Sequence, residues 1–184
     1  AESAALASYL KGQGISRIFT SPLGRARDTA TITCETLGLE PRVEPWMAEL
    51  KLKTDFPDRR SAWDLHGEII RSAEYLANPD RFERIEHFPS ARVRAALKTL
   101  QAESDRFFLS LGYAREGGVY RVRQRNEEML AVFAHGGFGL AWLSVLLEIP
   151  LPLVWSGFFL HPSSVTQVLF DERTPDIAVP RCLM

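Results

Sequence analysis

The fold is decided by the stretch 15–30, ISRIFTSPLGRARDTA, in which a strand pattern runs straight into a helix pattern. Residues 15–20 alternate and are β-branched or aromatic, which predicts a strand. The run Ser21-Pro22-Leu23-Gly24 predicts a turn. A helix is then expected over 27–37, with one stripe of small and apolar residues at helical spacing: Ala26, Ala30, Thr33 and Leu37.

The same arrangement recurs near the other end of the chain. Residues 129–134, MLAVFA, form a continuous apolar run of the kind found in parallel strands that are buried on both faces. His135-Gly136-Gly137 follows at once, and a buried helix is expected over 138–147. Two strand–turn–helix units therefore frame the chain.

Outward from these units the patterns alternate between helix and strand. Further helices are expected at 2–10 and 91–111, a broken helical pattern at 66–88, short strands at 39–43, 120–123 (an edge strand) and 165–170, and a proline-broken tail from Thr174. This alternation predicts an α/β fold, a three-layer α/β/α sandwich with a mostly parallel sheet. We expect one domain over 1–184, with 50–125 as a helical insert or cap.

Composition excludes several classes of protein. The chain has 184 residues with 22 Lys and Arg against 23 Asp and Glu, a formal charge of −1. A dedicated nucleic-acid binder usually carries a basic excess, so no nucleic-acid partner is expected, although a local basic pocket remains compatible with this balance. Two distant cysteines, Cys34 and Cys182, make neither a disulfide framework nor a zinc motif, and a reducing, cytoplasmic location is expected.

Membrane insertion is not expected either. The most lipophilic stretch, 138–160, is interrupted by Glu148, Pro150 and Pro152, and it reads as a buried helix followed by a loop. The first residues show no basic stretch and no apolar core, so no signal peptide is expected. The helix pattern at 2–10 has no cap, methionine or strand before it, and we therefore expect the given sequence to start downstream of the true N-terminus.

Both strand–helix junctions suit an anionic ligand. Ligands of open α/β sheets bind beyond the carboxyl ends of strands, and each junction opens a helix whose free N–H groups favour an anion. Arg25 would supply a planar cation that matches phosphate oxygens, and the glycines after His135 allow close approach. Taken alone, Arg25 reads as a solvated residue, His135 as structural and the glycine pair as a turn. Together they predict a phosphoryl site.

Three segments then carry a family resemblance. Residues 21–30, SPLGRARDTA, resemble the S-P-L-x-R-A-x-x-T-A motif of the histidine phosphatase, or phosphoglycerate mutase-like, superfamily. Residues 134–137, AHGG, resemble that family's second histidine motif. Residues 45–50, PWMAEL, are similar to the segment that carries its acidic residue.

The resemblance implies a phosphomonoester hydrolase that acts through a phosphohistidine, without metal or cofactor, on a small-molecule phosphate ester. It implies catalytic roles for Arg25, Glu49 and His135, and phosphate binding by Arg25, His135 and Gly136. Glu49 would protonate the leaving oxygen and then help to activate water; the competing reading is an exposed loop carboxylate.

The family's signature Arg-His-Gly is absent from the 184 residues. His66-Gly67 follows no strand pattern and is a poor substitute. The nucleophile is therefore expected upstream of Ala1, and the alternative is a natural variant without it. The alternatives to hydrolysis are a non-catalytic phosphoryl-ligand binding module, a phosphoglycerate mutase-type phosphotransferase, and a protein-interaction partner that uses its arginine-bearing face. The sequence does not predict the substrate or the oligomeric state.

Overall fold

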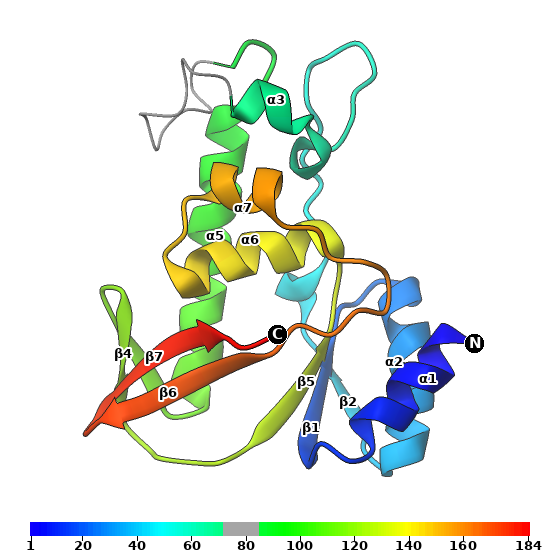
Figure 1. Ribbon diagram of the computed structural model, residues 1–184, viewed down its shortest axis with the longest axis vertical. Coiled ribbons are helices and arrows are strands. Elements are labelled where there is room, and N and C mark those ends of the chain that lie inside the picture. Colours follow the sequence, from blue (N-terminus) through cyan, green and yellow to red (C-terminus); the bar gives the residue numbers. More distant parts are fainter. Residues whose placement is uncertain (72–84) are drawn as a thin grey trace.

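The computed structural model describes residues 1–71 and 85–184, and it confirms the α/β fold. The described residues form a parallel sheet, an antiparallel sheet and helices around them. Figure 1 shows the antiparallel strands β6 and β7 on one side, α1 and α2 on the other, and β1 and β5 between them.

The parallel sheet has the order β2-β1-β5 and brings the two predicted junctions together. Thr20, the last residue of β1, pairs with Val43 of β2 and with Phe133 of β5. Because all three strands run the same way, the segments that follow them emerge at one edge of the sheet. The strands are β1 (Ile15–Thr20), β2 (Pro41–Val43) and β5 (Met129–Phe133).

Two helices pack on this sheet and on each other. They are α1 (Glu2–Leu10) and α2 (Gly24–Leu37), both predicted, although α2 begins three residues before the predicted start at 27. Burial of apolar side chains holds this layer together. Leu10, Ile18, Ala30, Cys34, Ala131 and Phe133 form its core.

The second sheet is antiparallel, with the order β3-β4-β7-β6, and the sequence did not predict it. The predicted edge strand at 120–123 is an inner strand, because β4 pairs with both β3 and β7. The tail predicted to be proline-broken contains β7. The four strands of this antiparallel sheet are β3 (Tyr113–Glu116), β4 (Val119–Val122), β6 (Val168–Thr174) and β7 (Ile177–Cys182).

The proline in β7 explains the second of these errors. A proline cannot donate to a neighbouring strand, so it is unfavourable where a strand has neighbours on both sides. Here β4 pairs only with Ile177 and Ala178, and Pro180 lies beyond that pairing, opposite Phe170 of β6. The strand therefore accommodates Pro180 at a position with one neighbour.

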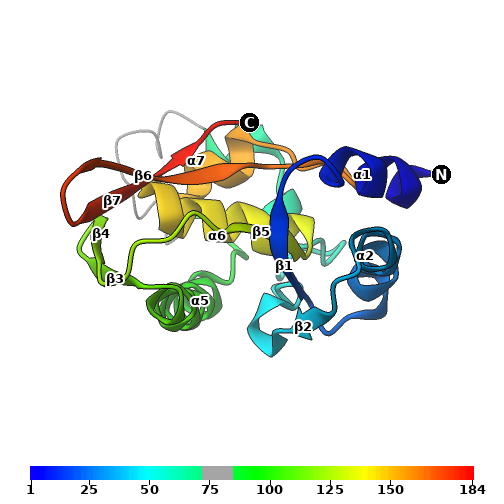
Figure 2. The same cartoon turned by 90° about the horizontal axis from the view of Figure 1, so that it is seen from below.

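The remaining helices cover the main core. Their bounds are α3 (Gly67–Ile70), α5 (Ser90–Ser110), α6 (Gly136–Leu147) and α7 (Leu151–Gly157), with 3₁₀ turns η1 (Pro45–Met47) and η2 (Ala62–Asp64). In Figure 2, α6 lies between α5 and the antiparallel sheet. The long helix is confirmed to within one residue at each end, and α3 covers only the start of the pattern at 66–88, whose Asn78-Pro79 break is outside the described residues.

The stretch predicted to be a helix and a loop contains two helices. A proline in the first turn of a helix costs no hydrogen bond, and Pro152 occupies that place in α7. The loop expectation was therefore wrong at 151–157. Among the described residues, no helix is both long and apolar enough to cross a membrane.

Candidate active site

The aligned ends of β1 and β5 place Ser21 against His135. The Ser21 N–H donates to the Phe133 carbonyl at 2.9 Å, continuing the strand pairing by one residue. Beyond it, Ser21 Oγ lies 2.7 Å from His135 Nε2. Ser21 is fully buried, and its oxygen also accepts the Leu23 N–H at 3.2 Å. One buried hydroxyl thus joins the turn before α2 to the histidine before α6.

His135 is half-buried and lies within electrostatic reach of both other predicted site residues. Burial is the main cause that lowers the pKa of His135 below its ordinary value, followed by the positive charge of Arg25, while Glu49 opposes the shift. Arg25 and Glu49 therefore both act electrostatically on the His135 ring, although 110 positions separate Arg25 from His135. A neutral ring with its proton on Nδ1 satisfies the contact with Ser21, whose hydroxyl then donates to Nε2.

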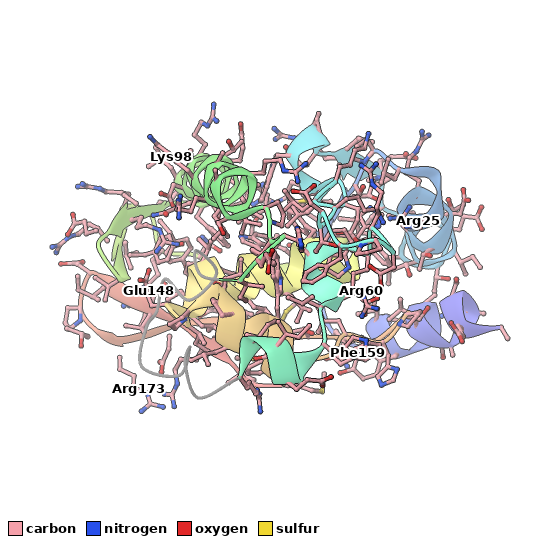
Figure 3. All side chains as sticks on the ribbon, turned by 90° about the horizontal axis from the view of Figure 1, so that it is seen from above. Arg25, Arg60, Lys98, Glu148, Phe159 and Arg173 are labelled. Atoms are coloured by element: carbon pink, nitrogen blue, oxygen red, sulfur yellow. The ribbon has the colours of Figure 1, made fainter. Side chains whose placement is uncertain are left out.

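Arg25 sits in the first turn of α2 with its side chain exposed. Figure 3 looks from the side toward which β1 and β5 run, and it shows Arg25 on α2. The helix begins without a side-chain cap, so its dipole and its first N–H groups favour an anion near that end. The predicted cation and the predicted helix terminus therefore belong to the same first turn of α2.

Glu49 follows η1 and sits at the N-terminus of α6. Its carboxylate accepts the N–H groups of Phe138 at 2.8 Å and Gly137 at 3.4 Å, besides that of Leu50 at 3.0 Å. It is half-buried and held from three directions, which an exposed loop carboxylate is not. The N–H groups of α6 that the sequence offered to a ligand are consequently occupied by the chain's own carboxylate.

The glycines after His135 differ in their surroundings. Gly136 is exposed, and a Cβ added there would meet only the Leu160 carbonyl oxygen, at 3.8 Å. Gly137 is buried under the indole of Trp63, so close that an added Cβ would lie 2.5 Å from Trp63 Cδ2. Gly136 alone therefore remains open to a ligand beside His135.

The sequence did not indicate that Ser21 and Trp63 would lie at the site. Ser21 was taken only as part of a turn, and its position directly after a strand, level with His135 after another, was the available signal. A tryptophan in the sequence indicates only core or a pocket wall, and this holds equally for Trp63, Trp142 and Trp155. In the structure Trp155 is buried in the core, Trp142 donates to Ser104 Oγ at 2.8 Å, and Trp63 borders the site.

Other polar groups lie elsewhere. His66 caps α3 without a side-chain bond and faces Glu68 at 3.4 Å. Arg121 and Arg125 pair with carboxylates of their own antiparallel sheet, Glu116 at 2.9 Å and Glu172 at 2.7 Å. Across residues 1–71 and 85–184, no three His, Cys, Asp or Glu side chains gather to hold a metal ion.

Several solved structures are similar to this chain. A mycobacterial hydrolase ("hydrolase 1") is similar over all of this chain and 82% of its own, with 24% identity and a TM-score of 0.59. A mycobacterial glucosyl-3-phosphoglycerate phosphatase is similar over 98% of this chain and 82% of its own, with 22% identity and a TM-score of 0.59. An Entamoeba histolytica phosphoserine phosphatase, solved with 3-phosphoglyceric acid, is similar over all of this chain and 79% of its own, with 15% identity and a TM-score of 0.63.

These likenesses show the fold. A comparison with curated proteins gave no match. The family model described as the histidine phosphatase superfamily (branch 1) matches residues 1–107, more than half of the chain, and includes both the Arg25 motif and Glu49. The chain therefore belongs to the histidine phosphatase superfamily.

Proposed function

We propose that the protein hydrolyses phosphate monoesters through a phosphohistidine, at the site made by Arg25, Glu49 and His135. The observation that carries the proposal is the contact between Ser21 and His135, which joins the turn that leads to the exposed Arg25 with the histidine before α6. The nucleophilic histidine is proposed to come from a segment that precedes Ala1. The site itself holds the groups that surround the phosphoryl group rather than the one that attacks it.

Each group has a definite task in this scheme. The guanidinium of Arg25 and the first turn of α2 hold the phosphoryl oxygens, and His135 contributes a further hydrogen bond from its ring with Gly136 beside it. The nucleophile's nitrogen bonds to phosphorus as the ester P–O bond breaks, and Glu49 gives its proton to the leaving oxygen. Water then attacks phosphorus, the P–N bond breaks, and Glu49 takes the water's proton. Positioned charge of this kind supplies most of the catalysis in phosphoryl transfer.

The substrate is proposed to be a small phosphate ester. Two structural neighbours are described as phosphatases of small molecules, glucosyl-3-phosphoglycerate and phosphoserine. Phosphoglycerate mutase-type transfer would place the phosphoryl group on a second substrate instead of water. We further propose that residues 50–125 act as a cap on the domain, and that the protein works in the cytoplasm without a metal, a cofactor, a membrane or a nucleic-acid partner.

The test is a panel of phosphate esters with the full-length protein. We expect turnover and an acid-labile phosphoenzyme. Arg25→Ala should lower turnover by about a hundredfold or more, as the loss of a charge-stabilising donor does. Arg27→Ala is the matched control, because Arg27 is also exposed on the first turns of α2 but is not part of the proposed site.

The outcomes separate the alternatives. Turnover of Arg25→Ala within threefold of the unmodified protein would remove Arg25 from the site. Arg25-dependent binding of inorganic phosphate without any phosphoenzyme would favour the non-catalytic binding module. Transfer of the phosphoryl group to an added alcohol in preference to water would favour the phosphotransferase.

A further inference from the structure

The indole of Trp63 fills the space above Gly137. A Cβ added to Gly137 would lie 2.5 Å from Trp63 Cδ2, 2.7 Å from Cε2 and 2.8 Å from Glu49 Oε1. The backbone of Gly137 does not have positive φ, so conformational freedom is not what requires glycine at this position. Glycine is required because the Trp63 ring and the Glu49 carboxylate already occupy the space that a Cβ would take. Trp63 and Glu49 are therefore neighbours above the first turn of α6.

Trp63 lies on a segment that is closed by its own hydrogen bonds. Its neighbour Ala62 is fully buried and donates to the Leu52 carbonyl at 2.9 Å. Eight residues before Ala62, Thr54 donates to the Arg60 carbonyl at 3.0 Å, so that the loop between them closes on itself. The ring is thus delivered to the site on a loop whose two sides are hydrogen-bonded together. A group on such a support keeps its place better than one on an open loop.

We propose that Trp63 is a positioning residue, which holds the Glu49 carboxylate on the N-terminus of α6 by closing the niche over Gly137. A glutamate side chain has three rotatable bonds, and the ring removes the space into which the carboxylate could turn. It also keeps water from the hydrogen bonds between Glu49 and the amides of Gly137 and Phe138. The positional part stands on these contacts alone. The catalytic part, that Trp63 acts on the reaction through Glu49, rests on the proposed function.

One amide reports directly on the position of Glu49. Phe138 is the third residue of α6, and the first N–H groups of a helix have no partner within the helix. The Phe138 N–H is bound by Glu49 Oε1, whereas the next amide, Gly139, already donates to the His135 carbonyl. Protection of the Phe138 amide from hydrogen exchange therefore measures how firmly Glu49 is held.

The experiment measures this protection by NMR. Trp63→Ala should speed exchange at Phe138 about tenfold, as loss of a hydrogen bond of ordinary strength would. Gly137→Ala should do the same by pushing ring and carboxylate apart.

Phe56→Ala and Gly136→Ala are the matched controls, since Phe56 shares the loop but packs against His87, and a Cβ at Gly136 has room. Trp63→Phe, which retains a ring, should fall between Trp63→Ala and the unmodified protein, and it gives the same readout if the alanine variant does not fold. Unchanged protection in Trp63→Ala, or equal loss in the Phe56→Ala control, would overturn the positional proposal.

Leaving-group dependence tests the catalytic part separately. Trp63→Ala should lower kcat for alkyl phosphates more than for aryl phosphates with an activated leaving group, as Glu49→Gln should, because only the former need a proton. The double variant should be no slower than Glu49→Gln alone. Equal losses on both esters, or additive losses in the double variant, would contradict a role through Glu49. A protein without any hydrolysis would refute the proposed function, while the exchange result would still decide the positional proposal.

Discussion

Replacement of Ser21 by alanine removes the hydroxyl that joins the two strand ends of the site. The Ser21→Ala variant loses the 2.7 Å contact with His135 Nε2 and the 3.2 Å bond from the Leu23 N–H. Ser21 is fully buried, so water cannot take the place of the lost oxygen without a rearrangement of the turn. Both partners are left unsatisfied at the centre of the site.

The magnitude follows from that burial. A buried donor or acceptor that loses its partner costs about 1–3 kcal/mol. For a chain of this length each kcal/mol lowers Tm by about 2–4 °C. The His135 ring also loses the contact that fixes its orientation, so we expect inorganic phosphate to bind about tenfold more weakly, the equivalent of one hydrogen bond of ordinary strength.

The assay is thermal unfolding followed by circular dichroism, with and without inorganic phosphate. Ser144→Ala is the matched control, because Ser144 is also buried and donates one 2.8 Å bond to the Ile149 carbonyl, outside the site. We expect both variants to lose stability and only Ser21→Ala to lose phosphate binding. Equal phosphate affinity in the two variants would refute the reasoning that Ser21 holds His135 in the site.

Two further predictions concern titration and packing. The pKa of His135 is lower in the folded protein than in the unfolded chain, so the unfolded chain binds the proton first as the pH falls below about 6.5, and the free energy of unfolding declines. His135→Asn should flatten this decline when the free energy of unfolding is measured with urea at several pH values. Arg115 is 7% exposed and donates to Asp105 at 2.7 Å, Glu148 at 2.9 Å and the Tyr120 hydroxyl at 2.6 Å. Arg115→Ala should lower the free energy of unfolding in urea by about 1–3 kcal/mol. This is less than a fully buried pair costs when it is broken, because both carboxylates still reach water; a loss below about 0.5 kcal/mol would contradict this role.

The parallel layer of the fold could be predicted because its signals are local. Alternation at 15–20, an apolar run at 129–134 and helical stripes on both sides each lie within a few residues. The antiparallel sheet could not be predicted in the same way. Its strands come from 113–122 and 168–182, and Pro180 argues against a strand unless the pairing partners are known.

For the site, the sequence indicated which residues to consider, and the structure showed how they contact one another. The Arg25 and His135 motifs follow strands, so their position at one sheet edge was foreseeable. The occupation of the α6 N-terminus by Glu49 was not, because 88 positions separate Glu49 from Gly137. A helix terminus attracts any nearby anion, and only the packed fold determines that the nearest one belongs to the chain itself.

By itself, then, the sequence determined the two strand–turn–helix units, the long helix and the residue types that are proposed to bind a phosphoryl group. Only the tertiary structure decided that Ser21 bonds His135, that Glu49 occupies α6 and that Trp63 covers Gly137. The physical reason is that secondary structure depends on neighbours along the chain, whereas these contacts depend on which distant segments are buried against one another.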